Sequence, residues 1–223
     1  MTIGEVYQRY EVMPNLAEHM FRVTAVAETI GHHLLSAPLP EGALPFTQTD
    51  LDDVVTACLL HDLGNMAKFK LEYFPEFVEP QGLAYWLKIQ QRFWQNYGKN
   101  AHQATLQMLG ELGVSGRVKE LVDAVSFNKA KQNQTSPDYA RKLCAYADMR
   151  VGPHGIVSLD GRFVDGNTRY APDGKVGPFT YAMSACLRNI ERQLFAVIAL
   201  QPEDITDQKI APLLSRYDTF KLG

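Results

Sequence analysis

An uncharged stretch that ends in a histidine followed directly by an aspartate constrains this chain more than any other feature. Residues 54–60 carry no charge, which indicates a buried helix too short to cross a membrane. Asp50 is well placed to cap the start of this helix, and Gly64 to end it in a left-handed conformation. His61 and Asp62 would then lie in the last turn, where the carbonyl end of the helix dipole favours a cation. Both side chains can reach one ion, but further ligands must come from elsewhere in the chain.

The composition argues against several function classes. With 223 residues, of which 46% are hydrophobic and 21% charged, the chain can bury a core of its own. The formal net charge of −3 gives no reason to expect a surface for nucleic acid. The start of the chain lacks the order of a signal peptide, and no apolar stretch is long enough for a membrane helix. We therefore expect a cytoplasmic protein that binds neither nucleic acid nor membranes.

The cysteines point to packing and not to chemistry. Cys58, Cys144 and Cys186 lie in apolar surroundings, and none belongs to a Cys-x-x-Cys pair. This pattern predicts reduced, buried thiols and argues against a redox site or a structural zinc site.

Apolar residues recur at helical spacing through most of the chain, separated by breaks rich in proline or glycine. Residues 36–50 and 66–80 are predicted to be loops, and the aromatic residues of the second are expected to form the wall or lid of a pocket. Residues 155–177 are rich in glycine and only weakly helical. The pattern predicts an all-α fold with a single domain over residues 1–223, a core at about 14–151 and a C-terminal helical extension at about 178–219. Helices are predicted at residues 14–34, 50–63, 83–97, 101–112, 116–129, 138–151, 179–200 and 206–217.

Two further ligand-type residues lie next to buried helix faces. His19 can face inward, although a core histidine bonded to a carbonyl is the alternative. Asp148 sits among apolar residues, where a charge needs a partner or a metal. Together with His61 and Asp62 they provide two imidazoles and two carboxylates, a set that suits a divalent metal whose remaining positions are filled by water. Mn²⁺, Fe²⁺, Co²⁺, Ni²⁺ and Mg²⁺ fit this mixture of nitrogen and oxygen at least as well as Zn²⁺.

Three stretches carry a resemblance to a known family: Asn-Leu-Ala-Glu-His at 15–19, Leu-His-Asp-Leu-Gly at 60–64 and Ala-Tyr-Ala-Asp-Met-Arg at 145–150. Their order resembles that of the HD-domain superfamily of metal-dependent phosphohydrolases. The resemblance implies an all-α HD-domain helical bundle in which a metal-activated water attacks a phosphorus atom. Asp62 is the candidate to orient that water. The implied ligands of one divalent metal ion are His19, His61, Asp62 and Asp148.

Other residues are candidates for contacts to the substrate. The helix that begins near His102 resembles one that brings a histidine to a second metal or to the substrate phosphate in some HD proteins. His102 is therefore a candidate to contact phosphate or to protonate the leaving group, with an exposed helix start as the alternative. Lys68, Lys129 and Arg150 are candidate phosphate contacts, or else ordinary surface charges. Asn128, where two-metal members carry a histidine, completes the predicted substrate-binding residues.

The resemblance implies a hydrolase that acts on a nucleotide or another small phosphomonoester, with a small phosphorylated substrate as its partner. Asn65 stands where HD-type nucleotidases carry an acidic residue that helps activate water, and an asparagine cannot be a general base. A non-catalytic HD module that binds a nucleotide or a partner therefore stays open. So does an HD-type di-iron oxygenase, which requires two metals, and so does assembly into a homo-oligomer.

Overall fold

A computed structural model describes residues 1–170 and 175–223. It confirms the all-α fold: the one sheet in this described part is a hairpin of two short strands, β1 (Val151–Gly152) and β2 (Gly155–Ile156). The α-helices are α1 (Ile3–Arg9), α2 (Pro14–Leu34), α3 (Gln48–Leu60), α4 (Leu83–Tyr97), α5 (Ala101–Glu111), α6 (Gly116–Val125), α7 (Ala130–Thr135), α8 (Tyr139–Met149), α9 (Leu159–Tyr170), α10 (Pro178–Phe195) and α11 (Asp207–Leu214). Short 3-10 helices are η1 (Leu63–Ala67), η2 (Pro75–Val78), η3 (Phe127–Lys129) and η4 (Pro202–Asp204).

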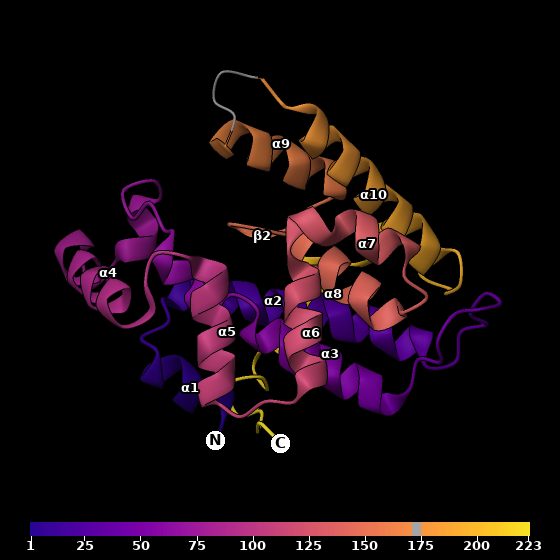
Figure 1. The fold of residues 1–223 in the computed structure, drawn as a ribbon, viewed down its shortest axis with the longest axis horizontal. Coiled ribbons are helices and arrows are strands. Elements are labelled where there is room, and N and C mark those ends of the chain that lie inside the picture. Colours follow the sequence, from indigo (N-terminus) through magenta and orange to yellow (C-terminus); the bar gives the residue numbers. More distant parts are fainter. Residues whose placement is uncertain (171–174) are drawn as a thin grey trace.

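Helices α2 and α3 run through the middle of the molecule and pack against each other and against α8 (Figure 1). Helix α6 covers α3, and α5 packs on η1, directly after the His-Asp pair. Helices α9 and α10 lie together on one side of the bundle, whereas α4 lies at the opposite end (Figure 1). Buried apolar side chains from Ile3 to Tyr217 form one continuous core. No helix among the described residues has the length and apolar character needed to cross a membrane.

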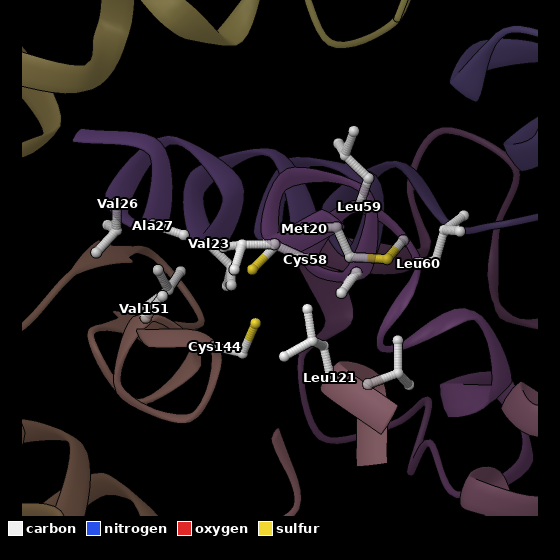
Figure 2. Close-up of a cluster of buried hydrophobic side chains, with 14 of the residues drawn as sticks. Met20, Val23, Val26, Ala27, Cys58, Leu59, Leu60, Leu121, Cys144 and Val151 are labelled. Carbon is white, nitrogen blue, oxygen red and sulfur yellow. The ribbon is translucent and has the colours of Figure 1, made fainter. Parts of the chain in front are cut away.

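The core between α2, α3 and α8 is built of apolar side chains and cysteines. Figure 2 shows Cys58 and Cys144 among the apolar side chains of this region, with Met20 and Val23 beside them. Both cysteines are buried free thiols, as predicted, whereas Cys186 is only partly buried. Full burial of a side chain such as Leu60 contributes roughly 1.5–3 kcal/mol, so the helices that carry the ligands are firmly anchored.

Both predicted ends of the central helix need correction. The N-cap of α3 is Thr47 and not Asp50: the Thr47 hydroxyl accepts from the Asp50 N–H at 3.3 Å, and the Asp50 carboxylate accepts from the Thr47 N–H at 3.0 Å. This capping box starts the helix earlier than predicted. Gly64 is not left-handed but lies in η1, and a Cβ there would come within 2.1 Å of the Ala101 carbonyl oxygen. A glycine is needed at this position because α5 approaches so closely.

The prediction that residues 155–177 are only weakly helical was wrong for residues 159–170, which form the regular helix α9, whereas residues 155–158 and 175–177 are not helical. Its apolar anchors are few, Leu159 and Phe163 being the buried ones. Ion pairs at helical spacing stabilise the rest, with Asp165 bonded to Arg162 and Arg169. The part of the prediction that falls on residues 171–174 lies outside the described residues.

Two further differences concern a helix that is shorter than predicted and a helix that was not predicted. The predicted helix at 116–129 ends at Val125, and η3 and α7 follow it. Helix α1 was not indicated by the sequence pattern. A capping box between Thr2 and Glu5 stabilises its N-terminal end.

Candidate metal centre

Four side chains from three helical segments meet where α2, α3 and α8 converge. His19 comes from α2, His61 and Asp62 directly follow α3, and Asp148 lies in the last turn of α8. One ligand atom from each lies within 4.8 Å of all the others. The structure therefore brings together all four residues that the sequence predicted as metal ligands. In the described part of the chain, this is the one group of three or more His, Cys, Asp or Glu residues so arranged.

The atoms that face each other are imidazole Nε2 atoms and carboxylate oxygens. His19 Nε2 lies 3.1 Å from Asp148 Oδ1 and 3.8 Å from Asp62 Oδ2. His61 Nε2 lies 3.4 Å from Asp148 Oδ1 and 3.6 Å from Asp62 Oδ2. Nitrogen donors thus alternate with oxygen donors around a common centre, which is the arrangement that a single cation requires.

His61 is the most constrained of the four. Its Nδ1 lies 2.8 Å from the backbone carbonyl oxygen of Cys58, and a carbonyl can only accept, so Nδ1 carries a proton. Its Nε2 is buried and has no hydrogen-bond partner among the described residues. Burial alone would lower the pKa of His61, but the charges of Asp62 and Asp148 outweigh it and raise the pKa to about 9.

Asp148 is held in its charged form. Burial would raise the pKa of this carboxyl, yet its hydrogen bond with His19, the close approach of His61 and the charges of both imidazoles hold it well below its ordinary value. A buried carboxylate and an unpartnered imidazole nitrogen that face each other fit a divalent cation, since the cation would satisfy both. The residues present therefore match the metal that the sequence pattern predicted.

The cluster opens into a pocket of about 260 Å³, slightly below the usual range of about 300–1,000 Å³ for small-molecule sites. His19, Asp62 and Asp148 line its floor. Aromatic residues of the 66–80 segment line one wall, which confirms the prediction for that segment; they are Phe69, Tyr73, Phe74 and Phe77. Phe74 and Phe77 pack against His154 at the tip of the β1–β2 turn, with ring centroids 5.7 and 5.5 Å away. The cationic lining residues are Lys68, Lys70, Arg162 and Arg169.

Of the residues that the sequence predicted as substrate contacts, one lines this pocket and the others do not. Lys68 lines it. His102 and Lys129 instead both pair with Asp123, at 3.3 and 2.9 Å, and neither belongs to the pocket lining. Asn128 is exposed in η3 and is also absent from the lining. The sequence reasoning chose His102 and Asn128 by family position and Lys129 by its charge, and none of the three lines the pocket.

Arg150 requires a correction, because it is a structural residue and not a phosphate contact. Its side chain is buried, and its guanidinium donates to the carbonyl oxygens of Val157 and Pro202 at 2.6 and 3.1 Å. It also donates to the Tyr146 hydroxyl at 2.6 Å. These bonds tie the end of α8 to the hairpin and to η4. Pro202 lies more than fifty residues further along the chain, so the sequence around Arg150 gave no sign of this acceptor.

The sequence reasoning missed four polar residues of the pocket: Asn15, Lys70, Arg162 and Arg169. The arginines were missed because α9 was not predicted. Their spacing is itself a signal, since seven residues correspond to two helical turns and place both side chains on one face. The same face could have been found from Asp165, which stands between them at i+3 and i+4 spacing.

The fold and the cluster together define the class of protein. It is an all-α protein with a cluster of imidazoles and carboxylates suited to a divalent cation. Comparison with protein families then gives the family. Residues 16–141, more than half of the chain, match the HD domain, and the chain belongs to the HD domain family. The match includes His19, His61 and Asp62 and ends before Asp148. HD domains are mostly metal-dependent hydrolases. A search of curated proteins found no match, and a search of solved structures found none.

Proposed function

We propose that this protein is a metal-dependent phosphohydrolase that acts on a nucleotide or another small phosphomonoester. The observation that carries the proposal is that three of the four cluster residues, His19, Asp62 and Asp148, line a pocket that is also lined by lysine and arginine side chains. A phosphate ester has negative oxygens for the cations and a phosphorus atom that can be presented to the cluster.

His19, His61, Asp62 and Asp148 would hold the ion. When bound, a divalent cation supplies a water of lowered pKa and neutralises charge on a phosphoryl oxygen. The Nδ1–H bond of His61 to Cys58 fixes the imidazole ring, so that Nε2 would be the atom available to the ion. Asp62 is part of both the cluster and the pocket lining, which supports a role in which its carboxylate would accept a hydrogen bond from the attacking water and orient it. The donor set is compatible with Mn²⁺, Fe²⁺, Co²⁺, Ni²⁺, Mg²⁺ or Zn²⁺.

The pocket walls support a substrate with an anionic end and an apolar or aromatic end. Lys68 and Lys70 lie in the segment that follows the His-Asp pair and provide positive charge. Phe74 and Phe77 provide aromatic surface in the same pocket, and such surface stacks on the flat face of a nucleobase. A volume of about 260 Å³ favours one small molecule over a polymer.

The test is an assay of purified protein, loaded with each metal in turn, against a panel of nucleoside monophosphates and other phosphomonoesters. We expect metal-dependent release of phosphate that Asp62→Ala abolishes. The matched control is Asp52→Ala, because Asp52 is exposed on α3 and its carboxylate accepts a hydrogen bond from Gln48 at 2.8 Å. Absence of phosphate release with every metal, from protein that binds metal, would reject hydrolysis of these substrates.

One observation favours a second candidate, a module that binds a nucleotide without hydrolysing it. In the described lining of the pocket, the cluster residues are the only carboxylates and imidazoles, and Asn65 lies beside them. No separate general base is therefore offered there. Under this alternative, a nucleotide raises the melting temperature of the metal-loaded protein while no product forms. The di-iron oxygenase gains no such support, because the described residues offer one metal-type cluster.

A further inference from the structure

We propose that α9 supplies a phosphate-binding subsite in which Arg162 and Arg169, positioned by Asp165, bind a phosphate group of the substrate. Helix α9 lies outside the residues that match the HD domain. The inference deepens the proposed function and rests on it for the identity of the ligand as a phosphate ester.

The two arginines are set as a pair by one carboxylate. Asp165 accepts from Arg162 Nη1 at 2.9 Å and from Arg169 Nε at 3.1 Å, and Arg169 Nη2 bonds to it as well. Asp165 itself does not line the pocket, whereas both arginines do. A carboxylate behind two guanidinium groups restrains their rotation, so less side-chain freedom is lost when they bind a ligand.

The Nε–H group of Arg162 is a hydrogen-bond donor that is not satisfied. This Nε is buried and has no hydrogen-bond partner among the described residues. A buried N–H without a partner is costly, and a guanidinium binds phosphate best through two parallel N–H donors. Since Asp165 occupies Nη1, the Nε side of Arg162 is the one left for an anion.

The charges of the pocket favour the same ligand. Its described lining holds four Lys or Arg side chains and two carboxylates, Asp62 and Asp148. The carboxylates belong to the metal cluster, so a bound cation would neutralise them and leave the walls strongly positive. An anion with several oxygens, such as a phosphate group, can bridge the arginines and the lysines.

The experiment measures binding of inorganic phosphate by calorimetry in two arms, one with a divalent metal bound and one in the presence of a chelator so that no metal contributes. We expect wild-type protein to bind phosphate, and Arg162→Gln to weaken the binding at least about tenfold. The matched control is Arg188→Gln on α10, because Arg188 also pairs with an aspartate, Asp160 at 2.7 Å, but does not line this pocket. The control should bind as wild type does.

A second variant guards against loss of the fold. Arg162→Lys keeps the charge but loses the paired donors, and we expect it to bind phosphate several-fold more weakly than wild type. Asp165→Asn should also weaken binding, and its melting temperature in phosphate-free buffer shows whether α9 stays folded. Wild-type affinity in both Arg162 variants, or no phosphate binding by the wild type, would overturn the inference.

The outcomes also separate this inference from the proposed function. If Arg162 is needed for phosphate binding but no substrate is hydrolysed, the subsite stands and the hydrolase proposal fails. If hydrolysis proceeds and both Arg162 variants keep the wild-type KM, the hydrolase proposal stands and the subsite fails.

Discussion

The imidazole of His61 donates through Nδ1 to the carbonyl oxygen of Cys58, three residues earlier on α3, at 2.8 Å. This bond fixes both the ring orientation and the tautomer of a side chain that is almost fully buried. The other ring nitrogen is left facing two carboxylates. The backbone of the central helix thus prepares its own terminal residue as a ligand.

Replacement of His61 by asparagine should remove metal binding almost completely. Loss of an outer partner of a ligand typically costs about 10–100-fold in metal affinity, and loss of the ligand should cost more. The measurement is calorimetric titration of chelator-treated protein with Mn²⁺ or Co²⁺. His32→Asn is the control, because His32 is exposed on α2 and lies away from the cluster. Equal affinity in the wild type and His61→Asn would show that the cluster is not the metal site.

Metal binding should release protons and strengthen as pH rises. The pKa of His61 is raised to about 9, so near pH 7 its Nε2 carries a proton that a cation must displace. About one proton per ion should appear in calorimetry as a heat that differs between buffers of different ionisation enthalpy. Asp148, whose pKa is lowered, stays ionised in this range and contributes no proton. Affinity that is flat between pH 7 and 9 would contradict the assignment.

The stability of the metal-free protein should change with pH in the opposite direction. A histidine whose folded pKa lies above its unfolded value of about 6.5 stabilises the fold fully below that value. The contribution is lost as the pH rises through about 9. The melting temperature in chelator should therefore fall between these limits, and His61→Asn should reduce the fall. A wild-type melting temperature that rises between pH 6.5 and about 9 would be inconsistent with a charged His61 stabilised by Asp62 and Asp148.

Gly64→Ala should destabilise the protein by roughly 1–3 kcal/mol, the usual cost of an overpacked interior. The added Cβ would meet the Ala101 carbonyl oxygen at 2.1 Å and the backbone nitrogen of Thr105 at 2.7 Å. Gly110→Ala is the control. Gly110 lies on α5, the helix that Gly64 contacts, and a Cβ there meets nothing within 4 Å. It should be neutral or stabilising by about 0.5–1 kcal/mol. Chemical denaturation of both variants measures the difference.

Arg150→Met should lower stability while the folded fraction keeps its affinity for phosphate. Each hydrogen bond to a charged group contributes roughly 1.5–3 kcal/mol, and the acceptors left behind would be buried. Urea denaturation gives the stability, and the phosphate titration described above gives the affinity. A stable variant with weakened phosphate binding would restore Arg150 as a substrate contact.

The four cluster residues could be predicted because they lie next to buried helix faces, where a charged or ligand-type side chain needs a partner, and because their order resembles that of the HD-domain superfamily. The sequence also predicted the extent of α4, which Gly98 ends with a positive φ. It failed at Gly64, where the reason for the glycine is α5, a helix more than thirty residues further along. It failed at α9 because charged pairs stabilise that helix more than apolar spacing does. Tertiary contacts of this kind leave no local pattern to read.

The bonds of Arg150 to the carbonyl oxygens of Pro202 and Ile205 have a consequence for how this protein divides into parts. Arg150 lies two residues after Asp148, so the position of one cluster residue depends on a segment more than fifty residues later. A fragment trimmed to residues 16–141 would lack Asp148, Arg150 and this C-terminal anchor. The unit that can hold an ion is therefore larger than the unit that the family match delimits, and engineering of the site has to begin from the longer one.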